Sequence, residues 1–450
     1  MNNNTINAIT PIDGRYLYKI EKLSDYFSEH ALFKYRVFVE IEYFLFLCDN
    51  VLKNKITKSE REKIKKIYQN FDLKNSKNIK KIENKTNHDI KAVEYFIKEK
   101  FKKLGLKKNI EFIHFGLTSQ DINNTAVPLL LKDFMNDIFH NEIQKLIKDL
   151  EKISKKWNNI PMMARTHGQP ASTTILGKEI YVFINRLKTE MKFLQKIPFV
   201  AKFGGATGNF NAHTVAYPKI NWHNFGNNFI EKKLKLKRLK YTTQIDDYDN
   251  LSRLFDSIKR TNTILLDFSK DIWSYISFDY FKQKVLKNEI GSSTMPHKIN
   301  PIDFENAEGN LGLSNAVFNH LSSKLPVSRL QRDLTDSTTL RNIGIPFAYS
   351  IIAYKSLTKG ISKLIVNKNK INQDLNDNWM LISEAIQTIL RREGYKNPYE
   401  KLKNITRINK TINEKEIINF IEKLKIKQSI KEEIKKITPH NYIGQYIKQK

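Results

Sequence analysis

The chain has 450 residues, of which 40% are hydrophobic and 11% aromatic, and this composition excludes an intrinsically disordered protein. Its single cysteine, Cys48, excludes an intramolecular disulfide and a cysteine-based zinc site, which fits a reducing compartment. The N-terminal residues lack the basic start and apolar core of a signal peptide, and no run reaches the roughly 20 apolar residues of a membrane span. The sequence therefore predicts a cytoplasmic protein that does not enter a membrane.

The formal net charge of +30 indicates either an anionic partner or a lysine-rich solvated surface. The lysines are interleaved with Glu, Asn and Ile, as in EREKIKKIYQN at 60–70, a pattern that is typical of exposed helix faces. No aromatic stacking motifs accompany the basic residues, so we expect no nucleic-acid partner.

Helical periodicity dominates the elements that the sequence predicts. Apolar residues recur at spacings of three and four over 139–157, 265–275 and 375–389, and the last segment is expected to end at Gly394. The segment 231–240, EKKLKLKRLK, alternates like an edge strand, although it also fits a basic helix end. The sequence predicts an all-α fold in which long central helices form a bundle.

Polar, glycine-containing segments interrupt this pattern, and each combines small donors with His, Arg or Lys. They are PIDGRY (11–16), TNHD (86–89), HFGLTSQDINN (114–124), RTHGQPAS (165–172), FGGATGNFNAH (203–213), GSSTMPHKINP (291–301) and QRDLTDSTTLRN (331–342). Loops on a helical scaffold are where sites are usually built, so we expect the functional residues in these segments.

Histidines lie in or near these segments, namely His88, His114, His167, His213, His297 and His320. No His-x-x-x-His pair and no HExxH motif occurs among them, which disfavours a metal site. Proton transfer is the better use, because histidine changes charge near neutral pH.

The segment 291–301 resembles an anion-binding loop. Backbone N–H groups around Gly291, Ser292 and Ser293 can form a donor concavity, Lys298 adds a full charge and Asn300 a neutral amide. A serine there can act as a base or only as a hydrogen-bond donor, and an ordinary capped turn fits the spacing equally well. The G-x-S-x-G motif is absent, which disfavours acyl-enzyme chemistry.

GSSTMPHKINP resembles the loop shared by the fumarase/aspartase superfamily, whose pattern is G-S-S-x-M-P-x-K-x-N-P. Further segments narrow the resemblance to the adenylosuccinate lyase family of bacterial type, from about residue 8 to TPHNYIGQYI at the C-terminus. These segments are PIDGRY, TNHDIKAVEYF, FIHFGLTSQDINN, ARTHGQPAS and LPVSRLQRDLTDSTTLRN.

The resemblance implies a lyase that releases fumarate by β-elimination, without a metal or organic cofactor. The implied substrates are adenylosuccinate, which gives AMP, and succinylaminoimidazole carboxamide ribotide, which gives the free carboxamide AICAR. An alternative is another fumarate-releasing lyase of the superfamily. A second is an inert nucleic-acid-binding protein with an inherited fold, against which the intact catalytic residues argue.

The resemblance also implies a role for individual residues. Ser292 matches the family's general base, His167 its general acid, and Glu305 the carboxylate that pairs with this histidine. The positions that hold the succinyl carboxylates match Thr118, Ser119, Ser293, Lys298 and Asn300. Further substrate contacts match Gln244 and Asn306, and positions around the nucleotide match Arg15, Tyr16, Asn87, His88, Asp89, Arg332, Ser337, Thr338, Thr339, Leu340 and Arg341.

One segment departs from the family pattern. Where the family has QIEPHD, this chain has QIDDYD at 244–249, so no role of that histidine transfers to Tyr248.

The resemblance finally implies three helical domains, expected at residues 1–111, 112–364 and 365–450. The central domain of long helices is expected to form the core of a homotetramer in which each active site draws on three subunits.

Overall fold

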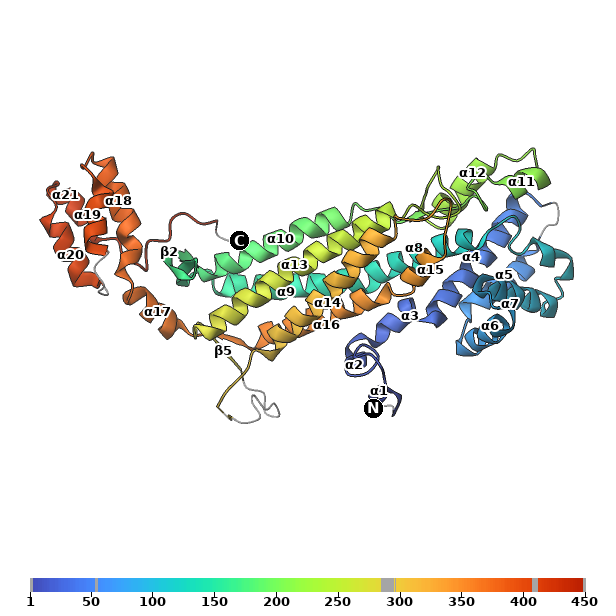
Figure 1. Cartoon of the computed structure of the whole chain (residues 1–450), viewed down its shortest axis with the longest axis horizontal. Coiled ribbons are helices and arrows are strands. Elements are labelled where there is room, and N and C mark those ends of the chain that lie inside the picture. Colours follow the sequence, from blue (N-terminus) through green and yellow to red (C-terminus); the bar gives the residue numbers. More distant parts are fainter. Residues whose placement is uncertain (1–2, 53–55, 285–294, 296, 407–411, 448–450) are drawn as a thin grey trace. The chain divides into compact units, whose positions relative to one another are not determined.

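The structure, a computed structural model, describes residues 3–52, 56–284, 295, 297–406 and 412–447 (Figure 1). Helices make up most of the described chain, which confirms the predicted all-α class. The chain divides into two compact units. The first comprises Met1–Ile143, Glu190–Thr263 and Gly309–Lys355, and the second comprises Gln144–Thr189, Ile264–Glu308 and Ser356–Lys450. The predicted three-domain boundaries stay a prediction.

The first unit contains the N-terminal helices. They are α1 (Asn3–Ile6), α2 (Leu17–Ile20), α3 (Ser24–Phe27), α4 (Glu29–Asn50), α5 (Lys58–Gln69), α6 (Leu73–Thr86), α7 (Asp89–Lys103) and α8 (Ser119–Phe134). Later in the chain it adds α11 (Asn211–Ala216), α12 (Trp222–Asn227) and α15 (Thr335–Leu340). Short 3₁₀ turns lie at Glu21–Leu23 and Lys107–Phe112, and π-helical turns at Met135–Phe139 and Asn228–Lys233.

Five long helices of the described chain contribute residues to both units, and the apolar periodicity over 139–157 and 265–275 predicts two of them, α9 and α13. They are α9 (His140–Lys156), α10 (Leu176–Leu194), α13 (Asp249–Ser277), α14 (Ile302–Lys324) and α16 (Gly344–Lys363). Within the first unit Asn262 of α13 donates to Ser314 of α14 and Ser350 of α16, so buried polar contacts join these helices as well as apolar ones.

The second unit holds two antiparallel strand pairs and the C-terminal helices. The strands are β1 (Pro161–Thr166) with β2 (Gln169–Ile175), and β5 (Phe281–Gln283) with β6 (Leu364–Val366). The helices are α17 (Lys368–Asn376), α18 (Ser383–Arg392), α19 (Pro398–Thr406), α20 (Glu414–Lys423) and α21 (Gln428–Lys435), with a 3₁₀ turn at Trp379–Ile382. Figure 1 shows α18 to α21 gathered into one group, whose core includes Ile386, Leu390, Ile417, Ile421 and Ile434.

The prediction of a continuous helix over 375–389 is wrong. Helix α17 ends at Asn376, and a 3₁₀ turn precedes α18. The Asn378 side chain donates a hydrogen bond to the Asp374 carbonyl near the end of α17. This side chain takes a carbonyl that a backbone N–H would use if the helix continued, so it favours the end of the helix there. The expected end is confirmed, because Gly394 has the left-handed φ of 71° typical of a residue just past a helix.

The segment 231–240 contains both structures that its pattern predicted, a helix end and a short strand. Its first residues belong to the π-helical turn, whereas β4 (Lys237–Arg238) pairs in parallel with β3 (Val200–Ala201). The strand is therefore real but only two residues long.

Two apolar clusters lie in the part of the first unit that the structure describes. One joins α4 to α5, α6 and α7 through Phe44, Ile64, Ile79, Phe96 and Phe101, and the other joins α4 to α8 and α12 through Tyr43, Ile122, Ala126, Trp222 and Phe225. Helix α4 thus packs on two sides, which explains why its sequence is apolar almost throughout.

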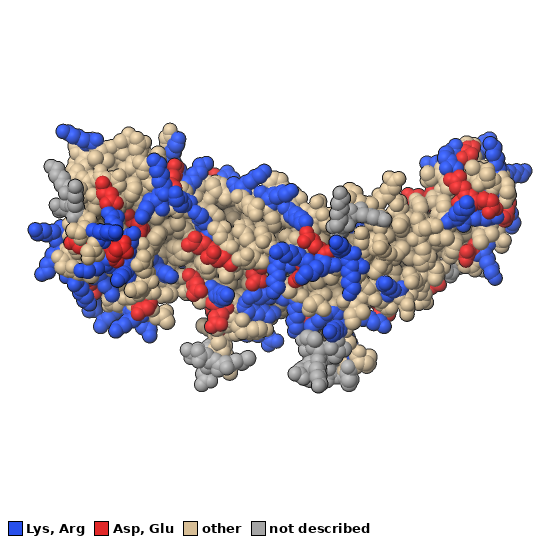
Figure 2. Space-filling model, turned by 180° about the vertical axis from the view of Figure 1, so that it is seen from behind, with Lys and Arg blue, Asp and Glu red and all other residues tan. Residues whose placement is uncertain are grey.

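Lysine and arginine side chains are spread over the face seen in Figure 2, with fewer acidic side chains between them. No helix in the described part of the chain combines the length and the apolar character needed to cross a membrane.

Candidate active site

The TNHD segment forms a tight corner between two helices. Asn87 ends α6 with a left-handed φ of 50°, and the His88 ring accepts a hydrogen bond from the Lys91 N–H at 3.2 Å as the N-cap of α7. Asp89 is therefore the first residue of α7, and the tight corner before it fixes the position of its backbone.

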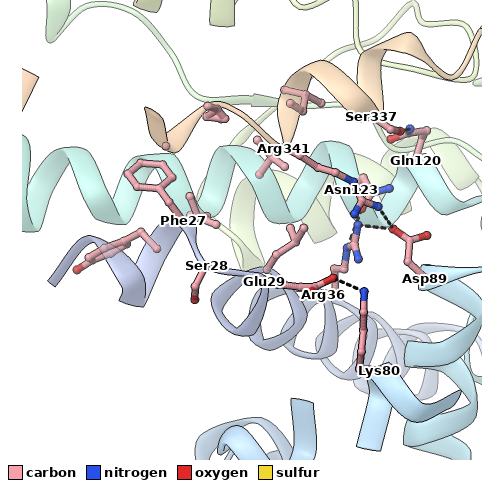
Figure 3. A pocket seen from close by; sticks show the side chains of 17 residues that line it. Phe27, Ser28, Glu29, Arg36, Lys80, Asp89, Gln120, Asn123, Ser337 and Arg341 are labelled. Carbon is pink, nitrogen blue, oxygen red and sulfur yellow. Dashed lines mark hydrogen bonds and ion pairs between the residues drawn. The ribbon is translucent and has the colours of Figure 1, made fainter. Parts of the chain in front are cut away.

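Asp89 joins two arginines from distant parts of the chain (Figure 3). Its Oδ2 accepts from Arg36 Nη2 at 2.8 Å and from Arg341 Nη2 at 3.3 Å. Burial raises the pKa of the Asp89 carboxyl, but Arg36, the Ile90 N–H and Arg341 outweigh burial and hold the pKa below its usual value. The carboxylate thus stays ionised between the two guanidinium groups.

Arg36 is a residue that the sequence analysis missed. It lies on α4, is 4% exposed, and donates from Nε to Asn123 Oδ1 of α8 at 2.9 Å. A single arginine within the apolar run ALFKYRVFVEIEY was a signal that could have identified it, because a buried charge needs a built partner.

These residues line a cavity of about 440 Å³ in the first unit. Its polar lining includes Arg36, Asp89, Gln120, Asn123, Ser337 and Arg341, and its apolar lining Phe27, Leu32, Val127, Leu130, Leu340 and Ile343. Figure 3 shows Arg36, Asp89 and Arg341 beside one another, with Gln120 next to Ser337. Four of the predicted nucleotide residues, Asp89, Ser337, Leu340 and Arg341, thus share one cavity.

Two further predicted residues adjoin the same cluster. Arg332 donates from Nη1 to Gln244 Oε1 at 3.4 Å and from Nη2 to Ser337 Oγ at 3.3 Å. Both bonds are long, so the guanidinium can exchange them for shorter charge-assisted bonds to an anion.

Thr118 and Ser119 lie at the start of α8, where backbone N–H groups favour an anion. The start of this helix is held by Asp121, which accepts from the Thr118 N–H at 2.8 Å and from Lys202 Nζ at 2.8 Å. Both charged side chains are fully buried, and the Gly204 N–H donates to the same carboxylate. The glycine-rich segment 203–213 therefore supports α8.

Two histidines of the polar segments are structural. His114 Nδ1 lies 2.5 Å from Glu40 Oε1. Burial lowers the pKa of His114, but the Glu40 carboxylate outweighs burial and leaves the pKa raised. His213 is buried against Gly116 and Tyr43, and burial lowers its pKa to about 4.

The remaining predicted residues of the first unit lie outside the lining of this cavity. Arg15 and Tyr16 precede α2, with the Arg15 guanidinium 6.0 Å from the Tyr16 ring centre. Thr338 and Thr339 lie on α15 beside Ser337, and Thr339 donates to the Thr335 carbonyl.

His167 occupies the turn of the β1–β2 hairpin in the second unit. Thr166 pairs with Gln169, so His167 and Gly168 form a two-residue loop, with φ values of 53° and 76°. Positive φ at both positions is the requirement of a type I′ turn, and it leaves the His167 side chain exposed at the tip.

Glu305 lies in the first turn of α14 and accepts from Trp273 Nε1 at 3.1 Å. Among the described residues of one chain, no hydrogen bond or ion pair joins Glu305 to His167. Asn306 accepts from Ser356 Oγ at 2.8 Å, Lys298 is exposed and Asn300 is half-buried. Ser292 and Ser293 lie outside the described residues, so their predicted roles stay predictions.

The first unit therefore presents cations, hydroxyls and a helix N-terminus to one region, an arrangement suited to a polar, anionic small molecule. The second unit presents a histidine on a rigid turn, which suits proton transfer.

Comparison with known proteins gives matches over most of the chain. Residues 14–316 match the lyase family, and residues 328–443 match the adenylosuccinate lyase C-terminal family. Among solved structures, a 3-carboxy-cis,cis-muconate lactonizing enzyme from Pseudomonas putida shares the fold with a TM-score of 0.76 at 17% identity, covering 96% of both chains. A fumarate lyase from Mesorhizobium sp. BNC1 does so with a TM-score of 0.75 at 15% identity, covering 94% of this chain and 95% of its own.

Relatives of higher identity include several named adenylosuccinate lyase. One from Dictyostelium discoideum is 54% identical over 98% of this chain and 97% of its own length. One from Haemophilus influenzae is 47% identical over 98% of this chain and 97% of its own, and one from Escherichia coli K12 is 45% identical over 98% of both. With such identity along nearly its whole length, the chain belongs to the adenylosuccinate lyase family.

Proposed function

We propose that the protein is an adenylosuccinate lyase that eliminates fumarate from adenylosuccinate and from succinylaminoimidazole carboxamide ribotide, giving AMP and AICAR. The observation that carries this proposal is the 54% identity to a relative of that name over 98% of the chain. Both reactions belong to purine synthesis, on the routes to AMP and IMP.

The elimination requires a base, an acid and stabilisation of negative charge. Ser292 removes a proton from the succinyl Cβ, the carbon adjacent to the one that bears the nitrogen, and negative charge builds on the carboxylate attached to Cβ. The carbon–nitrogen bond then breaks, fumarate gains its double bond, and His167 protonates the departing nitrogen. Glu305 stabilises the protonated imidazole.

The substrate's charges are held by the remaining predicted residues. The succinyl carboxylates are assigned to Thr118, Ser119, Ser293, Lys298 and Asn300, with Gln244 and Asn306 as further contacts. The nucleotide is assigned to the cavity side, where Arg332, Ser337 and Arg341 offer donors that suit a phosphate. Arg15, Tyr16, Asn87, His88, Asp89 and Thr338 to Leu340 complete this side of the site.

We further propose a cytoplasmic homotetramer whose sites are shared between subunits. Glu305 contacts Trp273 rather than His167 within one chain, which supports a partner for His167 on another subunit. Long helices also leave apolar side chains exposed: Val182 (42%) and Phe193 (57%) on α10, Trp273 (44%) on α13 and Leu313 (52%) on α14. Side chains of this kind are typical of an interface between subunits.

The test is fumarate release from adenylosuccinate by the purified protein. Wild-type protein should form fumarate and AMP in equal amounts. Ser292→Ala and His167→Ala should each lower kcat by at least about a hundredfold, the usual scale for an acid or base, while binding persists. Near-wild-type turnover of Ser292→Ala would remove the base assignment.

A further inference from the structure

The buried carboxylate of Asp336 collects hydrogen bonds from three segments of the first unit. Asp336 lies on α15 and is 4% exposed. Its Oδ2 accepts from the Tyr248 hydroxyl at 2.9 Å and from Gln120 Nε2 of α8 at 3.2 Å, while its Oδ1 accepts from the Ser337 N–H at 2.7 Å. One side chain therefore joins the start of α8, the segment before α13 and the helix that carries Ser337.

The same carboxylate faces the guanidinium of Arg332. Arg332 Nε lies 3.9 Å from Asp336 Oδ1, and this nitrogen is buried without a hydrogen-bond partner in the described structure. At this distance the charge orients the guanidinium without forming a direct hydrogen bond. The donors of Arg332 therefore stay available, since its other two bonds, to Gln244 and Ser337, are long.

Tyr248 is itself held in an uncommon conformation. It is 2% exposed with a left-handed φ of 58°, which is costly for a bulky residue and points to a constraint on its position. Its N–H donates to Asp246 Oδ1 at 2.7 Å, and its hydroxyl accepts from Asn124 Nδ2 at 2.9 Å. Burial raises the pKa of Tyr248 far above its usual value, so the hydroxyl remains a donor at neutral pH.

We infer that Asp336, oriented by Tyr248 and Gln120, is a positioning residue that presents Arg332 and Ser337 to the phosphate of the nucleotide. This inference rests on the proposed function. Arg332 lies before helix α15, and α15 has only six residues, so the helical hydrogen bonds of α15 alone cannot fix Ser337 and Arg332 in place. The hydrogen bonds from Tyr248 and Gln120 hold the Asp336 carboxylate, and with it the neighbouring donors, in place before the substrate binds. Binding then costs less conformational entropy, because these groups are already ordered.

The test separates the phosphate from the carboxylates by using the two products of the reaction as probes. AMP carries the phosphate, whereas fumarate carries only carboxylates. Tyr248→Phe keeps the buried ring and removes one hydrogen bond to Asp336. It should weaken AMP binding, measured by calorimetry, by about tenfold, the scale of a hydrogen bond to a charged group. The inhibition constant of fumarate should stay within about twofold of wild type.

Asp336→Asn provides a second variant, of equal volume, and should weaken AMP binding by at least as much. Tyr35→Phe is the matched control, because Tyr35 donates to Asp133 at 2.7 Å outside the cavity lining, and it should leave both affinities unchanged. A correctly folded Tyr248→Phe or Asp336→Asn protein with wild-type AMP affinity would overturn the inference, as would equal weakening of AMP and fumarate. Wild-type protein that forms no fumarate would instead overturn the proposed function.

Discussion

At the scale of single residues, the candidate site depends on charges that are buried and paired. Arg36 is 4% exposed and meets Asp89, whose side chain is 23% exposed. Such a pair adds little net stability, but removing one partner leaves a buried charge uncompensated. The ion pair is therefore more important for holding Arg36 and Arg341 in one place than for the stability of the fold.

Asp89→Asn should lower the melting temperature by about 3 °C, because it strands the Arg36 guanidinium in the interior. Thermal unfolding followed by circular dichroism measures this change. Glu62→Gln is the control, since Glu62 pairs with Lys65 at 3.8 Å on the surface and should change the melting temperature by less than about 1 °C. Equal shifts in both variants would contradict the buried role of Asp89.

The sequence pattern singled out residues that carry family motifs and did not single out residues whose contacts depend on packing. Asp89, Ser337, Leu340 and Arg341 were predicted, and the structure places them around one cavity. Asn123 and Asp336 were not singled out, because their partners lie far away in the chain and no local pattern records the contact.

At the scale of elements, the β1–β2 hairpin fixes the predicted acid. Gly168 has a φ of 76° and open space around its missing Cβ, so Gly168→Ala strains the backbone without a clash. The strain should shift the adjacent His167 and lower kcat by about tenfold, because small misplacements of a catalytic group are costly. Steady-state kinetics with adenylosuccinate measures the effect.

Gly105→Ala is the matched control for this variant. Gly105 has a φ of 79° and equally open surroundings, but it follows α7, away from the hairpin. It should lose similar stability and keep wild-type kcat. If both variants retain full kcat, the rigid turn is not what positions His167.

The segment 203–213 should make stability depend on pH through His213. The Tyr43 hydroxyl donates to the Phe115 carbonyl, so His213 Nε2 carries its proton toward Tyr43, and the buried Nδ1 has no partner among the described residues. Burial lowers the pKa of His213 from 6.5 to about 4. The unfolded chain therefore takes up this proton first as pH falls.

The contribution of His213 to stability should be complete above pH 6.5 and fall by roughly 3 kcal/mol as pH drops toward 4. Melting temperatures of wild type and His213→Gln at pH 7.5, 6 and 5 isolate this contribution. The variant should lose less stability on acidification. Parallel curves for the two proteins would show that His213 takes up no proton on unfolding.

Periodicity predicted the long helices because one-sided burial leaves a regular trace in the sequence, as in α9 and α13. It missed the β1–β2 hairpin, where a turn of His167 and Gly168 was interpreted only as a polar segment. It also missed the break after α17, because the apolar spacing continues across Asp377 and Asn378.

At the scale of the whole molecule, His167 and Ser292 are expected to reach one site from different subunits. Inactive His167→Ala and Ser292→Ala proteins, mixed, dissociated and reassociated, should recover activity. Random assembly in a symmetric oligomer gives about a quarter of sites with both residues intact. Mixed tetramers without activity would mean that one chain supplies both residues.

The measurement that tests the central claim most directly compares substrates for the wild-type protein. Fumarate release is followed with adenylosuccinate, argininosuccinate and malate at equal concentration. The phosphate-directed donors around Arg332 and Arg341 and the family membership predict rapid release from adenylosuccinate alone, with AMP formed in equal amount. Faster release from argininosuccinate or malate would contradict the assignment and indicate another fumarate-releasing lyase.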